Sequence, residues 1–273
     1  MDEDLVDIFD SSVSSLFSIP PIAFSTSSPT DIHTYNPPGS TLPVRLLLPH
    51  PPPALYTTLQ ANNLWLAGIY LADLISLDQL KPNVKGKRCC ELGAGAGLPS
   101  VMAYRDGGAA SVVCSDYDTE EVITVIEGNF RRAQEDAKDG RRLGDWAVTG
   151  HTWGTSTDKL CQAAAAEPRQ FDVLFLSDVI WVTAAHKVLL DSVFSLLAAD
   201  GVAHITCGLH TGRGPLERFI TRVESRGASI EVISEARWKL EGGWETFKRE
   251  EGGLEEERGV VVHLLLQRTT ASS

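Results

Sequence analysis

The chain has 273 residues, of which 43% are apolar, and a formal net charge of −12 at pH 7. This length and apolar content suffice for the core of one α/β domain with extensions. The acidic balance disfavours binding to the phosphate backbone of DNA or RNA, because the sequence has no basic stripe to offset it, and it favours a basic partner such as a lysine-rich protein segment.

Residues 1–55 form a Pro- and Ser-rich N-terminal arm that holds ten of the fourteen prolines. Proline lacks a backbone N–H and fixes φ, so this stretch cannot propagate a long helix or a central strand. Within it, Val44 to Leu48 is expected to form a short edge strand that ends before Pro49. We therefore divide the chain into an extended arm, residues 1–55, and a folded domain, residues 56–273.

The arm is followed by a segment, residues 59–80, whose apolar spacing predicts an amphipathic helix that Pro82 closes. Short apolar runs then alternate with helical patterns, which is typical of a doubly wound, mostly parallel seven-stranded sheet. The Gly- and Glu-rich segment 241–258 is interpreted as a solvated loop. Strands are expected near residues 87–92, 111–115, 146–150, 171–177, 202–207, 230–233 and 260–266, and helices near 98–106, 119–134, 184–199 and 214–226.

The strongest chemical signal is a glycine loop that follows the first of these strands and precedes a helix. It reads Glu91-Leu-Gly93-Ala94-Gly95-Ala-Gly97. Glycines at such a turn let the backbone approach a ligand and leave the helix N-terminus open to it, so we expect a nucleotide-like ligand at this edge. The spacing is Gly-x-Gly-x-Gly, whereas a dinucleotide-binding loop carries its third glycine one residue later.

A second acid narrows the choice of ligand. The second strand ends in Asp116, 23 residues beyond Gly93, where a carboxylate can accept hydrogen bonds from both ribose hydroxyls of an adenosine. This position suits NAD and S-adenosylmethionine equally. Glu91 favours the second, because its charge would repel a pyrophosphate but tolerates a sulfonium and an ammonium group. A nicotinamide-dependent oxidoreductase is therefore the least favoured reading.

Several segments together resemble the seven-strand methyltransferase family, and within it the eukaryotic protein lysine methyltransferases and their fungal nicotinamide N-methyltransferase-like relatives. In chain order they are Leu64-Trp65-x-Ala67-Gly68, Glu91 to Pro99, Ser115-Asp116-Tyr117, Thr152-Trp153-Gly154 and Phe171 to Trp181. The resemblance implies a Rossmann-like fold, S-adenosylmethionine as cofactor, and methyl transfer to a protein lysine or N-terminal amine. The fungal branch that the chain is most similar to includes enzymes that methylate translation elongation factor 1A.

The resemblance also implies which residues bind the cofactor. The glycine loop would lie against the methionine part, Asp116 would bind the ribose, and Trp153 would pack near the adenine. Flat indoles suit such a purine contact on physical grounds alone. One departure leaves the substrate-facing chemistry open, since Gln60 to Leu66 replaces a segment of the Gly-His-Leu-Leu-Trp-Asn type. The full cofactor-binding set is Trp65, Glu91, Gly93, Ala94, Gly95, Asp116, Tyr117, Trp153 and Ser177.

Candidates for handling the methyl acceptor follow the fourth strand. Asp178 lies one residue past it and is expected to be the catalytic residue that holds the incoming amine, with Trp181 as a pocket wall. Two histidines are candidate proton acceptors near the same edge. His186 falls inside a predicted helix and is expected at the surface, so we assign His210, in a Gly-flanked loop, to the substrate pocket.

The compartment and the partners follow from weaker signals. The five cysteines lack metal-ligand spacing and fit small buried residues in a reducing compartment. The N-terminus lacks the basic start and apolar run of a signal peptide, and no apolar stretch is long enough to span a membrane. We expect a cytoplasmic monomer with a protein substrate and no metal, nucleic acid or membrane partner. A small-molecule methyltransferase and a non-catalytic cofactor-binding partner protein stay open as alternatives.

Overall fold

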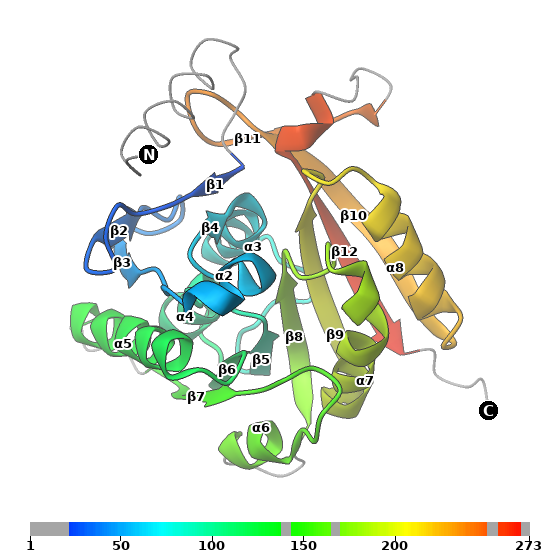
Figure 1. The fold of residues 1–273 in the computed structure, drawn as a ribbon, viewed down its shortest axis with the longest axis horizontal. Coiled ribbons are helices and arrows are strands. Elements are labelled where there is room, and N and C mark those ends of the chain that lie inside the picture. Colours follow the sequence, from blue (N-terminus) through cyan, green and yellow to red (C-terminus); the bar gives the residue numbers. More distant parts are fainter. Residues whose placement is uncertain (1–21, 138–142, 165–169, 250–255, 269–273) are drawn as a thin grey trace.

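The computed structural model describes residues 22–137, 143–164, 170–249 and 256–268. An eight-stranded sheet runs through the molecule with helices on both of its faces (Figure 1). In spatial order its strands are β11 (Trp244–Thr246), β10 (Ala228–Trp238), β12 (Val260–Arg268), β9 (Leu197–Gly208), β8 (Phe171–Ser177), β5 (Arg88–Leu92), β6 (Ser111–Asp116) and β7 (Asp145–Gly150). The helices against it are α3 (Leu66–Ser76), α4 (Leu98–Arg105), α5 (Glu120–Asp136), α6 (Asp158–Ala163), α7 (His186–Leu196) and α8 (Gly214–Glu224).

The direction of the strands brings the ends of several of them to one edge. β7, β6, β5, β8 and β9 are mutually parallel, and β12 lies between β9 and β10, antiparallel to both. Parallel neighbours require crossover connections, which helices provide here. The predicted doubly wound, mostly parallel α/β fold is thus confirmed, and the carboxyl ends of β5, β6 and β8 meet at the same edge of the sheet.

The eighth strand corrects the interpretation of segment 241–258 as a loop. β11 pairs antiparallel with the end of β10, with Trp244 opposite Trp238. The indole N–H of Trp244 donates to Asp73 Oδ2 at 2.7 Å, and its ring packs against Tyr70. A short 3-10 helix, η3 (Glu256–Gly259), precedes β12. The Gly- and Glu-rich composition does not predict this hairpin, because the contacts that stabilise it are made with α3, which is distant in the sequence.

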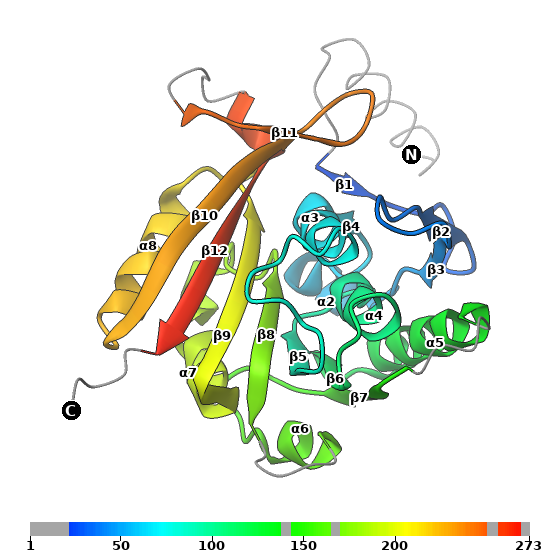
Figure 2. The same cartoon turned by 180° about the vertical axis from the view of Figure 1, so that it is seen from behind.

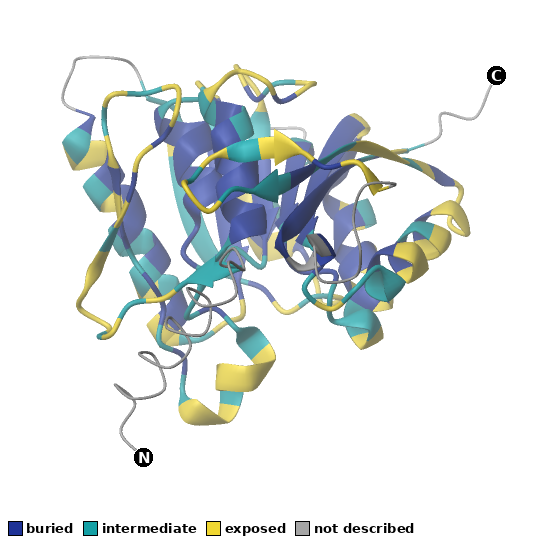
Figure 3. Cartoon of the chain, turned by 90° about the horizontal axis from the view of Figure 1, so that it is seen from above, coloured by how far each residue is buried: buried dark blue, intermediate teal, exposed yellow. Residues whose placement is uncertain are grey.

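Two separate apolar cores cover the two faces of the sheet. Alternate residues of a strand point to opposite faces, so that Cys89 joins one core and its neighbour Cys90 the other. The first core contains α3, α4 and α5, and the second contains α6, α7 and α8 (Figures 1 and 2). Figure 3 shows the burial concentrated on the strands and on the helix sides that face them. Four of the five cysteines are buried free thiols.

The single helix predicted over residues 59–80 is wrong at its start. A short helix, α2 (Pro53–Leu59), ends where Gln60 adopts a left-handed conformation with φ of 52°. A short strand, β4 (Leu64–Trp65), then pairs with β1 (Ala23–Phe24), and α3 begins only afterwards. The apolar spacing continues through this break, so it did not predict one. Residues 64–65 form a strand because they pair with a strand of the arm, and helical periodicity carries no information about such a contact.

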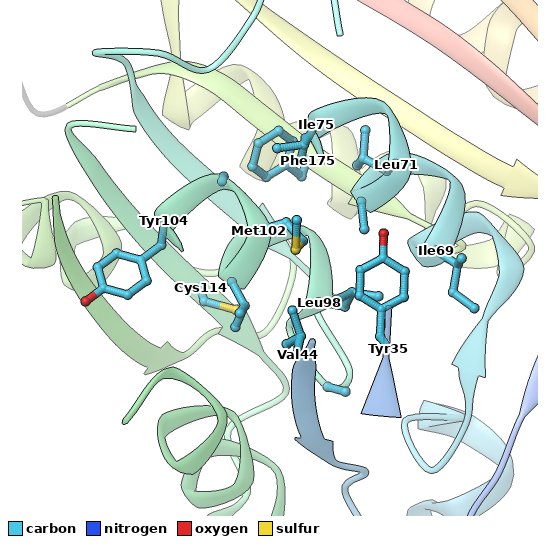
Figure 4. Close-up of a cluster of buried hydrophobic side chains, with 14 of the residues drawn as sticks. Tyr35, Val44, Ile69, Leu71, Ile75, Leu98, Met102, Tyr104, Cys114 and Phe175 are labelled. Carbon is cyan, nitrogen blue, oxygen red and sulfur yellow. The ribbon is translucent and has the colours of Figure 1, made fainter. Parts of the chain in front are cut away.

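The arm packs against the α3 to α5 face of the sheet. β3 (Val44–Leu47) forms where a short strand was expected, but it pairs with β2 (Ile32–Tyr35) instead of the central sheet. Arg105 donates to the carbonyls of Leu42 and Pro43 at 2.8 and 2.7 Å. Figure 4 shows Tyr35 and Val44 inserted among Leu98, Met102 and Leu71. Residues 22–52 therefore contribute to the core that supports α3 and α4, whereas residues 1–21 of the predicted arm lie outside the described part.

Smaller differences concern the later elements. The helix expected over residues 184–199 ends at Leu196, because Leu197 already pairs with Phe171 as the start of β9. The α6 helix follows the third strand without having been expected. Within the described ranges, no helix is long and apolar enough to cross a membrane.

Candidate functional site

A cavity of about 340 Å³ lies at the edge where β5, β6 and β8 end. The segments that follow these strands form one side of it, and α2 and the start of α3 form the other. Eleven of the twelve residues predicted for the site line it. They are Trp65, Glu91, Gly93, Ala94, Gly95, Asp116, Tyr117, Trp153, Ser177, Asp178 and Trp181.

Glu91 lies at the bottom of the site, fully buried near the end of β5. Its Oε2 accepts a hydrogen bond from the backbone N–H of Ser100, in the first turn of α4, at 3.1 Å. Its Oε1 is buried and has no hydrogen-bond partner among the described residues. Burial raises the pKa of Glu91 to about 8, against the opposing effect of the Ser100 hydrogen bonds. A cationic ligand placed near Glu91 would favour the charged form of this carboxyl group.

Two glycines of the loop have different tasks. Gly93 has φ of +72°, and an added Cβ would lie 2.6 Å from Val179 Cγ1 and 3.0 Å from the Trp153 ring. It is needed for close packing of the loop against the walls of the cavity. Gly95 has φ of +55°, and the nearest atom to its would-be Cβ is the Ala61 carbonyl oxygen at 3.9 Å. At Gly95 the backbone therefore faces open space that a ligand can occupy.

Asp116 ends β6 and holds the loop by its carboxylate. Oδ2 accepts the N–H of Gly95 at 2.7 Å, and Oδ1 accepts the N–H of Tyr117 at 2.6 Å. Burial raises the pKa of Asp116, and these two backbone hydrogen bonds oppose the rise. A carboxylate offers about four acceptor positions, so Asp116 can still accept hydrogen bonds from a vicinal diol.

Aromatic side chains close the cavity from two directions. Trp153 is half-buried after β7, and its ring lies against the position of Gly93. Trp65, at the start of α3, donates its indole N–H to the Gln60 carbonyl at 3.1 Å. Tyr117 lines the rim and is 39% exposed. The indoles are thus positioned by contacts that leave part of each ring facing the cavity.

His151 is a cavity residue that the sequence reasoning missed. It is buried directly after β7, and its Nε2 lies 2.9 Å from Ser192 Oγ of α7. Burial lowers its pKa, which favours the neutral imidazole. The position of His151, between β7 and the Thr152-Trp153 motif, could have predicted that it lines the cavity. Leu55 and Leu59 of α2 also line the cavity, and nothing in the arm sequence indicated this.

Asp178 has an unusual backbone conformation for a residue with a side chain. It follows β8 with φ of +57°, a left-handed conformation that costs free energy and is common at functional sites. Its N–H donates to the Thr206 carbonyl at 2.8 Å, and its Oδ1 accepts the N–H of Gly208 at 3.1 Å. Burial raises the pKa of the Asp178 carboxyl, and His210 and the Gly208 N–H oppose this rise.

The two candidate histidines have different surroundings. His210 does not line the cavity, and it lies behind two residues that do, stacked on Trp65 and 4.0 Å from Asp178. Its assignment to the substrate pocket stays a prediction. The expectation that His186 is a surface residue is wrong, because its ring is buried against Phe219 and its Nε2 donates to the Ile180 carbonyl. Among the described residues, no group of three or more His, Cys, Asp or Glu side chains is placed to hold a metal ion.

Comparisons with known proteins show which proteins the chain is similar to. The profile of a family described as lysine methyltransferase matches residues 57–226. The protein N-terminal and lysine N-methyltransferase of Schizosaccharomyces pombe is 30% identical over 212 residues, which is 74% of this chain and 80% of that protein. Its counterpart in Candida albicans is 32% identical, over 54% of this chain and 56% of that protein. A precorrin-6y C5,15-methyltransferase structure from Geobacter metallireducens is 13% identical with a TM-score of 0.49, covering 76% of this chain and 88% of that one.

Proposed function

Because the chain belongs to the lysine methyltransferase family, we propose that it methylates an amino group of another protein, either a lysine side chain or an N-terminal amine. The observation that carries this proposal is the buried Asp178 carboxylate in the wall of the cavity, with Trp181 lining the same space. A carboxylate there can hold an amine, and an indole can pack against its alkyl or cationic part.

The residues around the cavity fit S-adenosylmethionine, the cofactor of this enzyme class. Glu91 offers a buried oxygen without a partner to the cationic methionine end. Asp116 retains acceptor positions for the ribose hydroxyls, and the half-buried Trp153 offers a ring face to the adenine. Gly93, Ala94 and Gly95 would lie along the methionine part. We propose that Trp65, Tyr117 and Ser177 complete the cofactor contacts.

The cofactor supplies an activated methyl group, so the task of the protein is to bind, orient and exclude water. We assign Asp178 to accepting a hydrogen bond from the substrate amine and Trp181 to the wall that confines it. We propose that His210 acts on the substrate pocket through Asp178, which its Nδ1 approaches at 4.0 Å. The net charge of −12 favours a basic segment as the substrate.

The first substrate to test is translation elongation factor 1A, which the resemblance seen in the sequence suggests. Incubation of the purified enzyme with this factor and tritiated S-adenosylmethionine should put label into the protein band. Mass spectrometry of the product would assign the label to a lysine or to the N-terminal amine. Label that appears only in small metabolites of an extract would favour the small-molecule alternative and contradict our proposal.

The roles of the residues can be separated from the identity of the substrate. Asp178→Ala should leave binding of S-adenosylhomocysteine, measured by calorimetry, close to that of the wild type and should lower turnover. Asp158→Ala, an exposed acid in the first turn of α6, is the matched control and should change neither. Loss of both binding and turnover in Asp178→Ala would show that Asp178 does not act on the acceptor.

We also propose that the enzyme acts as a monomer in the cytoplasm. Free cysteines at all five positions suit a reducing compartment. Light scattering of the purified chain and fractionation of cells that express a tagged copy would test the two statements separately. A stable dimer would contradict the monomeric state, and enrichment of the tag in an organelle would contradict the cytoplasmic location.

A further inference from the structure

A turn after β9 carries His210 against two walls of the cavity without entering it. The His210 ring stacks on Trp65 with a centroid separation of 5.0 Å and an interplanar angle of 24°. Its Nδ1 lies 4.0 Å from Asp178 Oδ2. The side chain is only 12% exposed, and the cavity lining excludes it. His210 thus approaches the carboxylate without lining the cavity itself.

Gly208 makes this approach possible. Its N–H donates to Asp178 Oδ1 at 3.1 Å. An added Cβ would lie 2.7 Å from His210 Nδ1 and 3.7 Å from Asp178 Oδ1, and the first separation is shorter than non-bonded contacts of a Cβ atom allow. A side chain at this position would therefore push the imidazole away from the carboxylate, although the hydrogen bond from the backbone could persist.

Both ends of the turn are fixed to neighbouring elements. Leu209 is buried, and its N–H donates to the Val260 carbonyl at the start of β12 at 2.9 Å. Arg213 donates from Nη1 to Glu235 of β10 at 2.9 Å and from Nε to Glu257 of η3 at 2.8 Å. These three charged side chains are each less than one-fifth exposed. Paired charges that are largely shielded from water hold a fixed geometry better than exposed pairs do.

We propose that His210 is a positioning residue for Asp178: fixed by the Arg213 anchor and by stacking on Trp65, it holds the Asp178 carboxylate in place for the incoming amine. This inference rests on the proposed function for its consequence in catalysis. The interaction between the side chains of His210 and Asp178 is independent of the proposed function, because it is a property of the free protein.

The electrostatics of the pair support this role. Burial raises the pKa of Asp178, whereas His210 and the Gly208 N–H act in the opposite direction. Cys207 of β9 is a further titratable neighbour, and burial raises the pKa of its thiol well out of the neutral range. Of these side chains, His210 is thus the one that favours the ionised form of Asp178.

The test compares three single variants of the full chain. His210→Asn removes the imidazole, and Gly208→Ala displaces it while leaving both functional groups intact. Thr211→Ala alters an exposed residue of the same turn and is the matched control. The Asp178 carboxyl is titrated by NMR on protein labelled with ¹³C in aspartate, with Asp178→Asn providing the assignment. The pKa of Asp178 should rise by about one unit in His210→Asn, should also rise in Gly208→Ala, and should not move in Thr211→Ala.

Enzyme kinetics provide the second measurement. Both perturbing variants should lower kcat/KM for the protein substrate by about tenfold and move the acidic limb of its pH profile upward. Binding of S-adenosylhomocysteine should stay near that of the wild type. An unchanged pKa of Asp178 in His210→Asn would overturn the inference, even if that variant were less stable or less active. If the wild type methylates no protein, the proposed function fails, and the titration still decides the inference.

Discussion

The backbone N–H of Gly95 donates to Asp116 Oδ2 at 2.7 Å, and this bond joins the loop after β5 to the end of β6. The N–H groups of Gly93 and Ala94 donate in the same direction, to the Ser115 carbonyl at 3.0 and 3.1 Å. The loop and the end of the neighbouring strand are therefore one hydrogen-bonded unit. A change at Asp116 acts on the shape of the loop as well as on the ligand.

Asp116→Ala should weaken binding of S-adenosylhomocysteine by about 100-fold or more, because it removes charged hydrogen bonds to both the ribose and the loop. Calorimetry at constant pH and salt measures the effect. Asp118→Ala is the matched control, since Asp118 is 62% exposed and lies 3.7 Å from Lys159. Equal loss of affinity in the two variants would mean that Asp116 contributes only its negative charge, and no specific hydrogen bonds, to ligand binding.

Gly93→Ala should lower both the stability of the fold and the affinity for the cofactor. Alanine at this φ costs about 1 kcal/mol, and the clash of its Cβ with Val179 at 2.6 Å adds to this. Gly86→Ala isolates the first cost, because Gly86 has φ of +70° and no atom within 4 Å of the added Cβ. Urea denaturation should rank Gly93→Ala as the more damaging change.

A second substitution tests the clash directly. Val179→Ala removes the methyl group that an alanine at position 93 would meet, so Gly93→Ala combined with Val179→Ala should recover part of the lost stability. The two residues are in contact, and their effects should therefore not be additive. Strict additivity in the double variant would contradict the packing role that we assign to Gly93.

The acids of the site were predictable because of a property of parallel sheets. Glu91, Asp116 and Asp178 lie at or just beyond the ends of three predicted parallel strands, and such ends share one edge. Contacts between distant segments were not accessible in this way. The stacking of His210 on Trp65 joins segments 145 positions apart in the chain, and α2 lines the cavity although its sequence carries no signal for it.

The misplaced His186 illustrates the limit of periodicity. It was expected on the exposed side of a helix, but it stands at the first position of α7. A short 3-10 helix, η1 (Thr183–Ala185), directly precedes His186, whose Nε2 reaches the Ile180 carbonyl. The spacing rule of an α-helix does not extend across this junction, because a 3-10 helix has three residues per turn.

Glu91→Gln should change how stability depends on pH. The pKa of Glu91 is about 8 in the folded chain, against an ordinary value of 4.5, so the folded state binds more protons between these limits. Stability from this group is fully present below pH 4.5 and is lost as the pH rises through about 8. The free energy of unfolding of the wild type minus that of the variant should fall by an amount on the order of 4 kcal/mol between pH 5 and 8.5.

The difference in the free energy of unfolding between the wild type and Glu91→Gln isolates the contribution of Glu91 from that of other titratable groups. Burial lowers the pKa of His204 to about 3 and of His263 to about 4, so these residues destabilise the fold as the pH falls below 6.5. Their contribution is common to both proteins and cancels. Urea titrations at several pH values provide the measurement, and a difference that is flat with pH would show that Glu91 titrates normally.

Arg213→Ala should destabilise the fold much more than Arg237→Ala does. Both arginines pair with glutamates at the same end of the sheet, but Arg213 is 11% exposed and pairs with two of them. Its removal leaves Glu235 and Glu257 largely shielded from water without a counter-charge, which costs about 3 kcal/mol. Arg237 is 36% exposed and, within the described part of the chain, pairs with Glu245 only, and such a pair contributes less than about 1 kcal/mol.

The combination of Arg213→Ala with Glu235→Gln separates this charge effect from a loss of packing. If uncompensated charge is the main cost, the double variant should be more stable than Arg213→Ala, since one of the two stranded carboxylates is then neutral. If the lost guanidinium contacts dominate, the second substitution should bring no recovery. Because Arg213 anchors the turn that carries His210, the double variant should regain stability without regaining turnover. If both stability and turnover recovered, Arg213 would not be needed to hold His210 in place.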